Sequence, residues 1–263
     1  MSPSGVAEPS DVLVIGGGPG GVAAALVLAR RGRSVTIVDR ADRQGRGPCN
    51  GLLTPRALAE LDLLDVAPSP GVTISSISVR SGDREITRPW PDRAVLPATG
   101  LVVDRGDLGE ALLDRARAAG VTVLAGHTAT EPIVERGFVR GAVVVDQTGA
   151  TTERRCRYLV TADGATSRFG RSIGTVRRTD WPFVASLSNT WRRADVGATR
   201  STDGDDHTAL VEMHLGLTDR DGEFVAGVGW VVPTTDGRLH VSTSLWSTTS
   251  EFGVLSATDM LGA

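Results

Sequence analysis

The run "DVLVIGGGPGG", Asp11–Gly21, constrains the fold of this chain more than any other stretch. Its first half is a short continuous apolar run, typical of a buried parallel strand, and its second half has the spacing G-x-G-x-x-G at Gly16, Gly18 and Gly21. An apolar helical segment closed by Gly32 follows, and "SVTIVDR" then predicts a second strand. Strand, glycine turn, helix and strand together take about 30 residues, the length of a βαβ unit.

The three glycines predict a site for a dinucleotide. Glycine at these positions permits the turn and lets a diphosphate approach the backbone, while the helix N-terminus that follows favours negative charge. Asp39 ends the second strand, where its carboxylate can accept hydrogen bonds from ribose hydroxyls. An acid there disfavours a ribose 2′-phosphate, so NADP is not expected as the tightly held nucleotide. The pattern does not distinguish NAD from FAD.

The rest of the chain predicts two layers of different character. A helix over Asp107–Ala118 and a strand at 121–125 extend the parallel sheet. Beyond Trp181 helical periodicity is absent, and turn sequences separate the β-rich segments. A β-meander is expected first and an antiparallel sheet later, from the segments 133–135, 138–146 and 151–160, and then 207–215, 223–232 and 238–246.

Charge and cysteine usage exclude several functions. A formal net charge of −3 provides no broad positive field, so no nucleic acid partner is expected. No apolar stretch is long enough to span a bilayer and no basic leader precedes one, so we expect a cytoplasmic protein. Cys49 and Cys156 do not form a disulfide framework and lack His or Cys neighbours at metal-ligand spacing, so no metal site is predicted.

The stretch "TADGATSRFGRSIG", Thr161–Gly174, resembles the second marker of the flavoprotein superfamily that includes aromatic hydroxylases and geranylgeranyl reductases. The resemblance implies FAD as the cofactor and NAD(P)H as a transient electron donor. It also implies that Asp163 and Gly164 contact the flavin nucleotide and the donor, and that Arg105 in "VVDRGDLGEALL" lies next to the flavin. Read without the resemblance, "ADG" is simply a turn after a strand.

The stretch "GPCNGLLTPRALAEL", Gly47–Leu61, resembles the cysteine-containing substrate loop of the geranylgeranyl reductases. The resemblance implies a catalytic role for Cys49. Thr54 is a predicted N-cap and Pro55 a predicted first helical residue, so the helix start is well specified and the loop before it can serve the flavin pocket. An alternative stays open, in which Cys49 is a small buried hydrophobe beside a turn.

A later stretch, "GVGWVVPTTDG", is similar to the segment in which these reductases carry a Tyr-x-Trp-x-Phe-Pro motif and a glycine-Asp-Gly turn. Trp230 matches the tryptophan, and the resemblance implies that it acts catalytically beside the substrate. Val228 and Val232 stand where the family has aromatic side chains, so ring faces that could line a lipid channel are lost. The resemblance therefore implies an isoprenoid substrate without determining which one.

Taken together, the motifs predict an α/β fold in which a glutathione-reductase-type FAD-binding Rossmann domain with a β-meander joins a mostly antiparallel β-sheet substrate domain. The expected bounds are 1–66 and 99–179 for the FAD-binding domain, and 67–98 and 180–263 for the substrate domain.

The resemblance to the geranylgeranyl reductases, and among them to those acting on menaquinone, implies an FAD-dependent oxidoreductase that reduces an isoprenoid C=C bond. An aromatic monooxygenase and a non-catalytic flavin-binding remnant stay open as alternatives. The family's third flavin motif, a glycine-Asp pair, is expected beyond Ala263, so we expect a C-terminally truncated chain. The implied partners are a lipid or small-molecule substrate, a peripheral membrane contact, and a partner chain that supplies the missing segment.

Overall fold

The computed structural model describes residues 9–42, 49–175, 180–192, 208–218, 222–249 and 252. The chain divides into two compact units, each built from several segments of the sequence. The first unit comprises Met1–Gly45, Leu63–Ala67 and Gly106–Arg177. The second comprises Arg46–Asp62, Pro68–Arg105 and Arg178–Ala263. The assignment of cofactor to one domain and substrate to the other stays a prediction.

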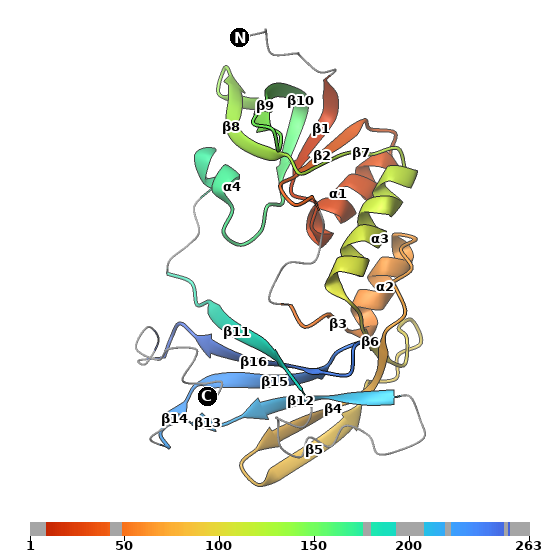
Figure 1. Ribbon diagram of the computed structural model, residues 1–263, viewed down its shortest axis with the longest axis vertical. Coiled ribbons are helices and arrows are strands. Elements are labelled where there is room, and N and C mark those ends of the chain that lie inside the picture. The colour runs from red at the N-terminus through yellow and green to blue at the C-terminus, as the bar shows by residue number, and fades with distance from the viewer. Residues whose placement is uncertain are drawn as a thin grey trace. The chain divides into compact units, whose positions relative to one another are not determined.

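The first unit contains a six-stranded sheet that is part parallel and part antiparallel (Figure 1). The first four strands in sheet order run parallel, and the last two form the predicted meander. In sheet order the strands are β7 (Thr122–Ala125), β2 (Val35–Asp39), β1 (Ser10–Ile15), β10 (Thr151–Thr161), β9 (Phe138–Val145) and β8 (Thr128–Glu135).

Strand β10 connects the two halves of this sheet. Its first residues pair antiparallel with β9, and from Cys156 onward it pairs parallel with β1. The parallel register places Thr161 next to Ile15, so the segment that follows Thr161 starts beside the glycine loop that follows Ile15. Two motifs far apart in the sequence therefore leave the sheet side by side, as the carboxyl ends of parallel strands do.

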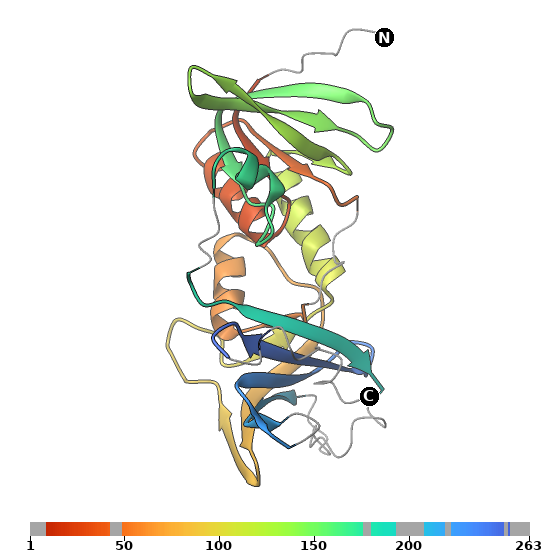
Figure 2. The ribbon, with the colours of Figure 1, turned by 90° about the vertical axis from the view of Figure 1, so that its left-hand side faces the viewer.

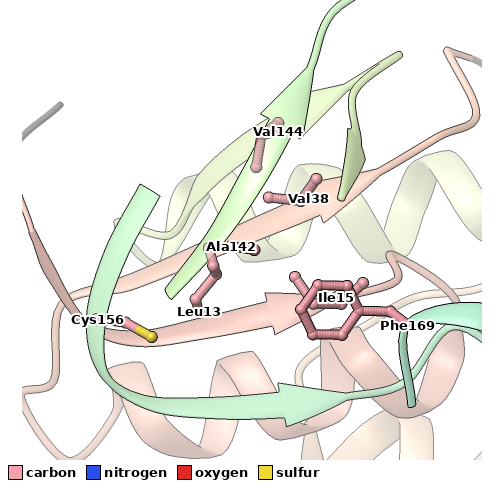
Figure 3. Close-up of a cluster of buried hydrophobic side chains, with 7 residues drawn as sticks. All are labelled: Leu13, Ile15, Val38, Ala142, Val144, Cys156 and Phe169. Carbon is pink, nitrogen blue, oxygen red and sulfur yellow. The ribbon is translucent and has the colours of Figure 1, made fainter. Parts of the chain in front are cut away.

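Apolar side chains from the parallel strands and the meander form one buried cluster (Figure 3). Each of its larger members removes a side chain from water, which stabilises the fold by about 2 kcal/mol per residue. The cluster joins both kinds of strand and one residue of the short helix α4 (Arg168–Ser172). Its members are Leu13, Ile15, Val38, Ala142, Val144, Cys156 and Phe169.

Two longer helices belong to this part of the chain, α1 (Pro19–Ala29) and α3 (Arg105–Ala118). Helix α1 packs on β1 and β2 and lies beside α3, and the meander lies on the other side of the parallel strands (Figure 2). Helix α3 carries Asp107 in its first turn and Arg115 and Arg117 in its last turn, a distribution that complements the helix dipole. The helix begins two residues before its predicted start.

The second unit contains an eight-stranded sheet that is mostly antiparallel. One pair departs from this pattern, because β12 runs parallel to β4. In sheet order the strands are β11 (Val184–Trp191), β16 (Leu239–Trp246), β15 (Gly227–Pro233), β12 (Thr208–Leu215), β4 (Val72–Ser81), β6 (Gly100–Val102) and β3 (Leu52–Leu53), with β5 (Arg84–Pro89) pairing with β4; β13 (Leu217–Thr218) and β14 (Phe224–Val225) form a separate ribbon.

The predicted start of helix α2 (Pro55–Leu63) is confirmed. The Thr54 hydroxyl oxygen accepts a hydrogen bond from the backbone N–H of Ala57 at 3.3 Å, and Pro55 is the first helical residue. The predicted fold class is confirmed as well. The hairpin of β4 and β5 (Figure 1) and strand β11 were not predicted.

Candidate functional site

The glycine loop begins where β1 ends. Gly16 has a φ of +108°, a conformation that residues with a side chain rarely adopt. A Cβ atom there would overlap the carbonyl oxygen of Ala162 and lie 2.9 Å from the Cα of Asp163. The Gly16 backbone N–H donates to the carbonyl of Val38 at 2.8 Å. The loop is thus pressed between the end of β2 and the segment that follows β10.

Helix α1 starts directly after this loop. Gly18 is its N-cap, with an extended backbone, and Pro19 is the first helical residue. Among the described residues no side chain caps this end, and a Cβ atom at Gly18 or Gly20 would meet open space. A Cβ at Gly21 would overlap the carbonyl oxygen of Gly16, so helix and strand can be this close only with glycine there. The N-terminus of α1 therefore presents backbone N–H groups, as a diphosphate requires.

Asp39 lies at the end of β2 and is 9% exposed. One carboxylate oxygen accepts from the backbone N–H of Gly17 at 2.7 Å, and the other accepts from the backbone N–H of Ala41 at 2.9 Å. A Cβ atom at Gly17 would lie 2.5 Å from the carboxylate, so a larger residue there would displace the Asp39 side chain. The sequence prediction missed Gly17, although its place between two motif glycines was the available signal. That Asp39 holds a ribose stays a prediction.

Asp163 and Gly164 follow β10 and lie at the glycine loop. The backbone N–H of Ala162 donates to the carbonyl of Ile15 at 2.7 Å, and Gly164 turns the chain with a φ of +94°. The Asp163 carboxylate accepts from the hydroxyl of Ser167 at 2.5 Å. The structure thus brings six predicted residues into the first unit: Gly16, Gly18, Gly21, Asp39, Asp163 and Gly164.

The other three predicted site residues belong to the second unit. Arg105 is the first residue of α3. Cys49 is exposed, so the alternative of a small buried hydrophobe is wrong. Trp230 lies on β15 and packs against a buried apolar cluster. That cluster consists of Ile74, Val102, Ala209, Val211 and Val232. The roles of all three residues stay predictions.

One histidine on the strand next to Trp230, His240, has a lowered pKa. His240 lies on β16, where it pairs with Val232 of β15. Among the described residues its Nε2 atom is buried without a hydrogen-bond partner. Burial lowers the pKa of His240 below the ordinary histidine value of 6.5, because desolvation penalises the charged imidazolium. A neutral imidazole is therefore favoured on this strand.

The second unit also buries a charged group that the sequence did not reveal. Glu212 on β12 is 2% exposed, and its carboxylate lies 3.2 Å from Nε2 of His214 and 3.6 Å from Nε of Arg80. Arg80 also donates to Glu85 at 3.0 Å, and the Ser78 hydroxyl donates to the other oxygen of Glu85 at 2.9 Å. Glu212 and His214 share β12, whereas Arg80, Ser78 and Glu85 come from β4 and β5, so the strand register brings the two groups together.

Neither a metal site nor a membrane-spanning helix is present among the described residues. No group of three or more His, Cys, Asp and Glu side chains in this part of the chain could hold a metal ion. No helix among the same residues combines the length and the apolar character needed to cross a membrane.

The sequence profile of the FAD binding domain family matches residues 9–213. The chain is 33% identical to a menaquinone reductase of Mycobacterium tuberculosis over 92% of this chain and 57% of that protein. It is 30% identical to a menaquinone reductase of Mycolicibacterium smegmatis over 91% of this chain and 56% of that protein. The chain thus spans just over half the length of these relatives.

Among solved structures, the fold is similar to that of a geranylgeranyl bacteriochlorophyll reductase-like protein from Thermoplasma acidophilum. The TM-score is 0.76 at 23% sequence identity, and the match covers 97% of this chain and 60% of that one. At this identity the likeness bears on the fold alone.

Proposed function

Because the chain belongs to the family of FAD-binding domains, we propose that it binds FAD and uses it to reduce a C=C bond in an isoprenoid chain. The two mycobacterial relatives are named menaquinone reductases, and their similarity runs through both units. A menaquinone side chain is therefore the first substrate to test, and a geranylgeranyl group is the second.

One observation carries the FAD assignment. The glycine loop and the Ala162–Gly164 segment come from distant parts of the sequence and meet in backbone contact at Gly16. Together with the uncapped start of α1 they form a cradle that fits a diphosphate. A Cβ atom added at Gly18 would have no other atom within 4 Å, so a ligand group can approach this part of the backbone. In this proposal the backbone N–H groups at the start of α1 hold the diphosphate, and Asp39 holds the adenosine ribose.

When bound and reduced by NAD(P)H, FAD would supply the hydride, and the protein supplies position and surroundings. Reduction of an isolated alkene adds one hydride and one proton to its two carbons, and positive charge develops on the more substituted carbon. The face of the Trp230 ring can stabilise that charge. The apolar cluster behind Trp230 supports a wall from which water is excluded. Cys49, with an exposed thiol, is the proposed proton donor on the substrate side.

The proposal includes the partners of such a reaction. NAD(P)H serves as the transient electron donor. A substrate with a long isoprenoid chain resides in a lipid bilayer, so we propose a peripheral membrane contact. A further polypeptide segment, in the same chain or in a partner, supplies the part of the relatives that this sequence does not span.

The test is reconstitution with FAD under anaerobic conditions, followed by NADH or NADPH and a menaquinone with an unsaturated side chain. Mass spectrometry of the extracted lipid is expected to show a gain of two hydrogen atoms. We expect Trp230→Leu to slow this conversion with FAD content unchanged, whereas Trp181→Leu, at a 61% exposed tryptophan, serves as the matched control. FAD-loaded protein that leaves menaquinone and geranylgeranyl chains unchanged would contradict the proposal. Oxygen uptake with an aromatic substrate would support a monooxygenase in its place.

A further inference from the structure

Strand β5 forms the exposed outer edge of the hairpin that it makes with β4. All six of its residues, Arg84–Pro89, are exposed. Among the described residues β5 pairs with β4 alone, and Figure 2 shows the hairpin projecting beyond the neighbouring strands of the eight-stranded sheet. The second unit therefore has an edge where a whole strand is accessible to a partner.

The strand register places one residue of β5 in line with Trp230. Ile86 pairs with Val79 of β4, which pairs with Met213 of β12. Met213 in turn pairs with Trp230 of β15. Side chains of paired residues project from the same face of a sheet, so these four form one apolar row across four strands, about 14 Å long at ordinary strand spacing. Ile86 is 57% exposed and the other three are half-buried, so the face that carries Trp230 continues to the exposed edge.

The charges of β5 divide between the two faces of the sheet. Arg84 and Arg88 each lie two residues from Ile86 and therefore share its face. Glu85 projects from the opposite face, where its carboxylate accepts a hydrogen bond from Arg80 at 3.0 Å. The face of β5 that carries Ile86 thus has two positive charges and no negative one.

A second exposed apolar side chain lies on the same face. Leu215 of β12 is 39% exposed, and the register through Ser81 of β4 places it in line with Arg84. Arginines beside exposed apolar side chains suit an anionic lipid bilayer, because headgroup phosphates accept from guanidinium groups while the apolar side chains leave water. A strand added by a second copy fits this edge less well, because Pro89 has no N–H to donate and charged side chains oppose such pairing.

We propose that Arg84, Ile86, Arg88 and Leu215 form the docking surface by which the second unit binds an anionic lipid bilayer. This inference rests on the proposed reduction of an isoprenoid lipid, since a substrate of that kind resides in a bilayer, and it names the surface that the membrane contact uses. The apolar row joins the docked edge to Trp230, the residue beside which the reduction is proposed.

The first test is co-sedimentation of the purified chain with vesicles of phosphatidylcholine and phosphatidylglycerol, without FAD or substrate. The chain is expected to bind, and added salt is expected to release it. Arg84→Gln combined with Arg88→Gln should weaken binding roughly 30-fold, because each basic side chain near an anionic surface contributes about fivefold. Arg31→Gln combined with Arg33→Gln, at two exposed arginines of the first unit, changes the net charge equally and should bind like the unaltered chain. Equal losses in the two double variants would overturn the inference.

A second test locates the contact directly. Ile86→Cys, in a chain that also carries Cys49→Ser, is labelled with an environment-sensitive fluorophore, and Cys156 does not compete for the label because it is buried. Its emission is expected to shift to shorter wavelength when anionic vesicles are added. The same label at Val184→Cys, at a 49% exposed residue of β11 in the same sheet, should not respond. No shift at position 86, an equal shift at both positions, or a shift that depends on protein concentration and not on lipid would overturn the inference.

Vesicle binding and lipid reduction can be lost independently. A chain that reduces menaquinone in detergent but binds no vesicles would overturn the docking surface alone. A chain that binds anionic vesicles through this surface but reduces no isoprenoid lipid would overturn the proposed reduction and leave the docking surface in place. All variants are compared after circular dichroism has shown that each is folded.

Discussion

Each unit buries a carboxylate, and the groups that surround the two carboxylates differ. Asp39 in the first unit accepts from backbone N–H groups of Gly17 and Ala41. Glu212 in the second unit lies against the side chains of Arg80 and His214. Backbone donors close to a glycine motif come with the local chain conformation, whereas the Arg80 side chain lies near Glu212 only because β4 pairs with β12 in this register. The first arrangement can be inferred from a short motif, and the second cannot.

The comparison predicts that the two units fail differently when altered. Substitutions in the glycine loop should weaken nucleotide binding, because backbone groups of the loop form the site. Substitutions in the charged cluster around Glu212 should lower the free energy of unfolding and leave the nucleotide affinity of the folded protein unaltered.

The largest effect is expected from Gly16→Ala. The added methyl group would overlap the carbonyl of Ala162 in a conformation with φ of +108°, so the loop must shift. We expect FAD affinity to fall about 100-fold, since overpacking of this kind costs about 1–3 kcal/mol. Gly32→Ala, beyond the other end of α1, adds the same methyl group at a φ of +73° but into open space, and is the matched control for fluorescence titration. Equal affinities for the two variants would show that the close contact is unimportant.

The next effect is expected from Arg80→Met, which leaves Glu212 with His214 as its remaining side-chain partner in the cluster. Arg80 is 26% exposed and Glu212 is 3% exposed at the side chain, so the loss is smaller than for a fully buried pair. We expect about 2 kcal/mol less stability in urea unfolding, with FAD affinity unchanged. Arg84→Met, on the exposed strand β5, is the control and should unfold like the unaltered chain. A loss of FAD affinity in Arg80→Met would break the distinction between the units.

A smaller effect is expected from Asp39→Asn. The amide keeps one oxygen that can accept from Gly17 but loses the charge and the second acceptor. We expect FAD affinity to fall about tenfold, equal to about 1.4 kcal/mol, in isothermal titration. Asp42→Asn, at an exposed carboxylate nearby, is the matched control. If both variants bind FAD like the unaltered chain, Asp39 has no part in nucleotide binding.

The smallest effect concerns two exposed turns, one in each unit. Hydrogen bonds from Thr148 and from the Ala150 backbone lower the pKa of Asp146 below 3.8, and those from Arg238 and Thr234 lower the pKa of Asp236. A lowered folded-state pKa stabilises the fold above the unfolded value and loses this contribution as pH falls through the folded one.

Both Asp146→Asn and Asp236→Asn should therefore reduce the acid sensitivity of unfolding slightly between about pH 4 and about pH 2. Added salt should weaken the contribution of Asp236, which depends on the charge of Arg238, more than that of Asp146, which depends on neutral donors. Urea unfolding at low and high salt measures this. An Asp146 effect that disappears first in salt would contradict the distinction.

The sequence predicted the elements whose signals are local. The first strand, glycine turn, helix and second strand were found because the motif and its apolar flanks lie within one short stretch. Strand β5 was missed because all its residues are exposed, which leaves no alternation of apolar and polar positions to detect. The parallel pairing of β12 with β4 was missed because pairing partners are not written in the spacing of either strand.

The residues of the candidate site also divide into those with local sequence signals, which were predicted, and those that meet only through the fold, which were not. The motif glycines, Asp39 and the pair Asp163–Gly164 were predicted and lie in one unit. The hydrogen bond from the Ser167 hydroxyl to Asp163 was not predicted, because it depends on where a turn places that hydroxyl. Glu212 and Arg80 were missed because they meet only across two strands that are distant in the sequence.

The most direct test of the central claim is titration of the purified, unaltered chain with FAD, followed by flavin fluorescence and by the thermal unfolding midpoint. If the backbone at the start of α1 holds the diphosphate, binding is saturable, the unfolding midpoint rises with FAD concentration, and ADP competes. Fluorescence and an unfolding midpoint that do not respond to FAD would contradict the account.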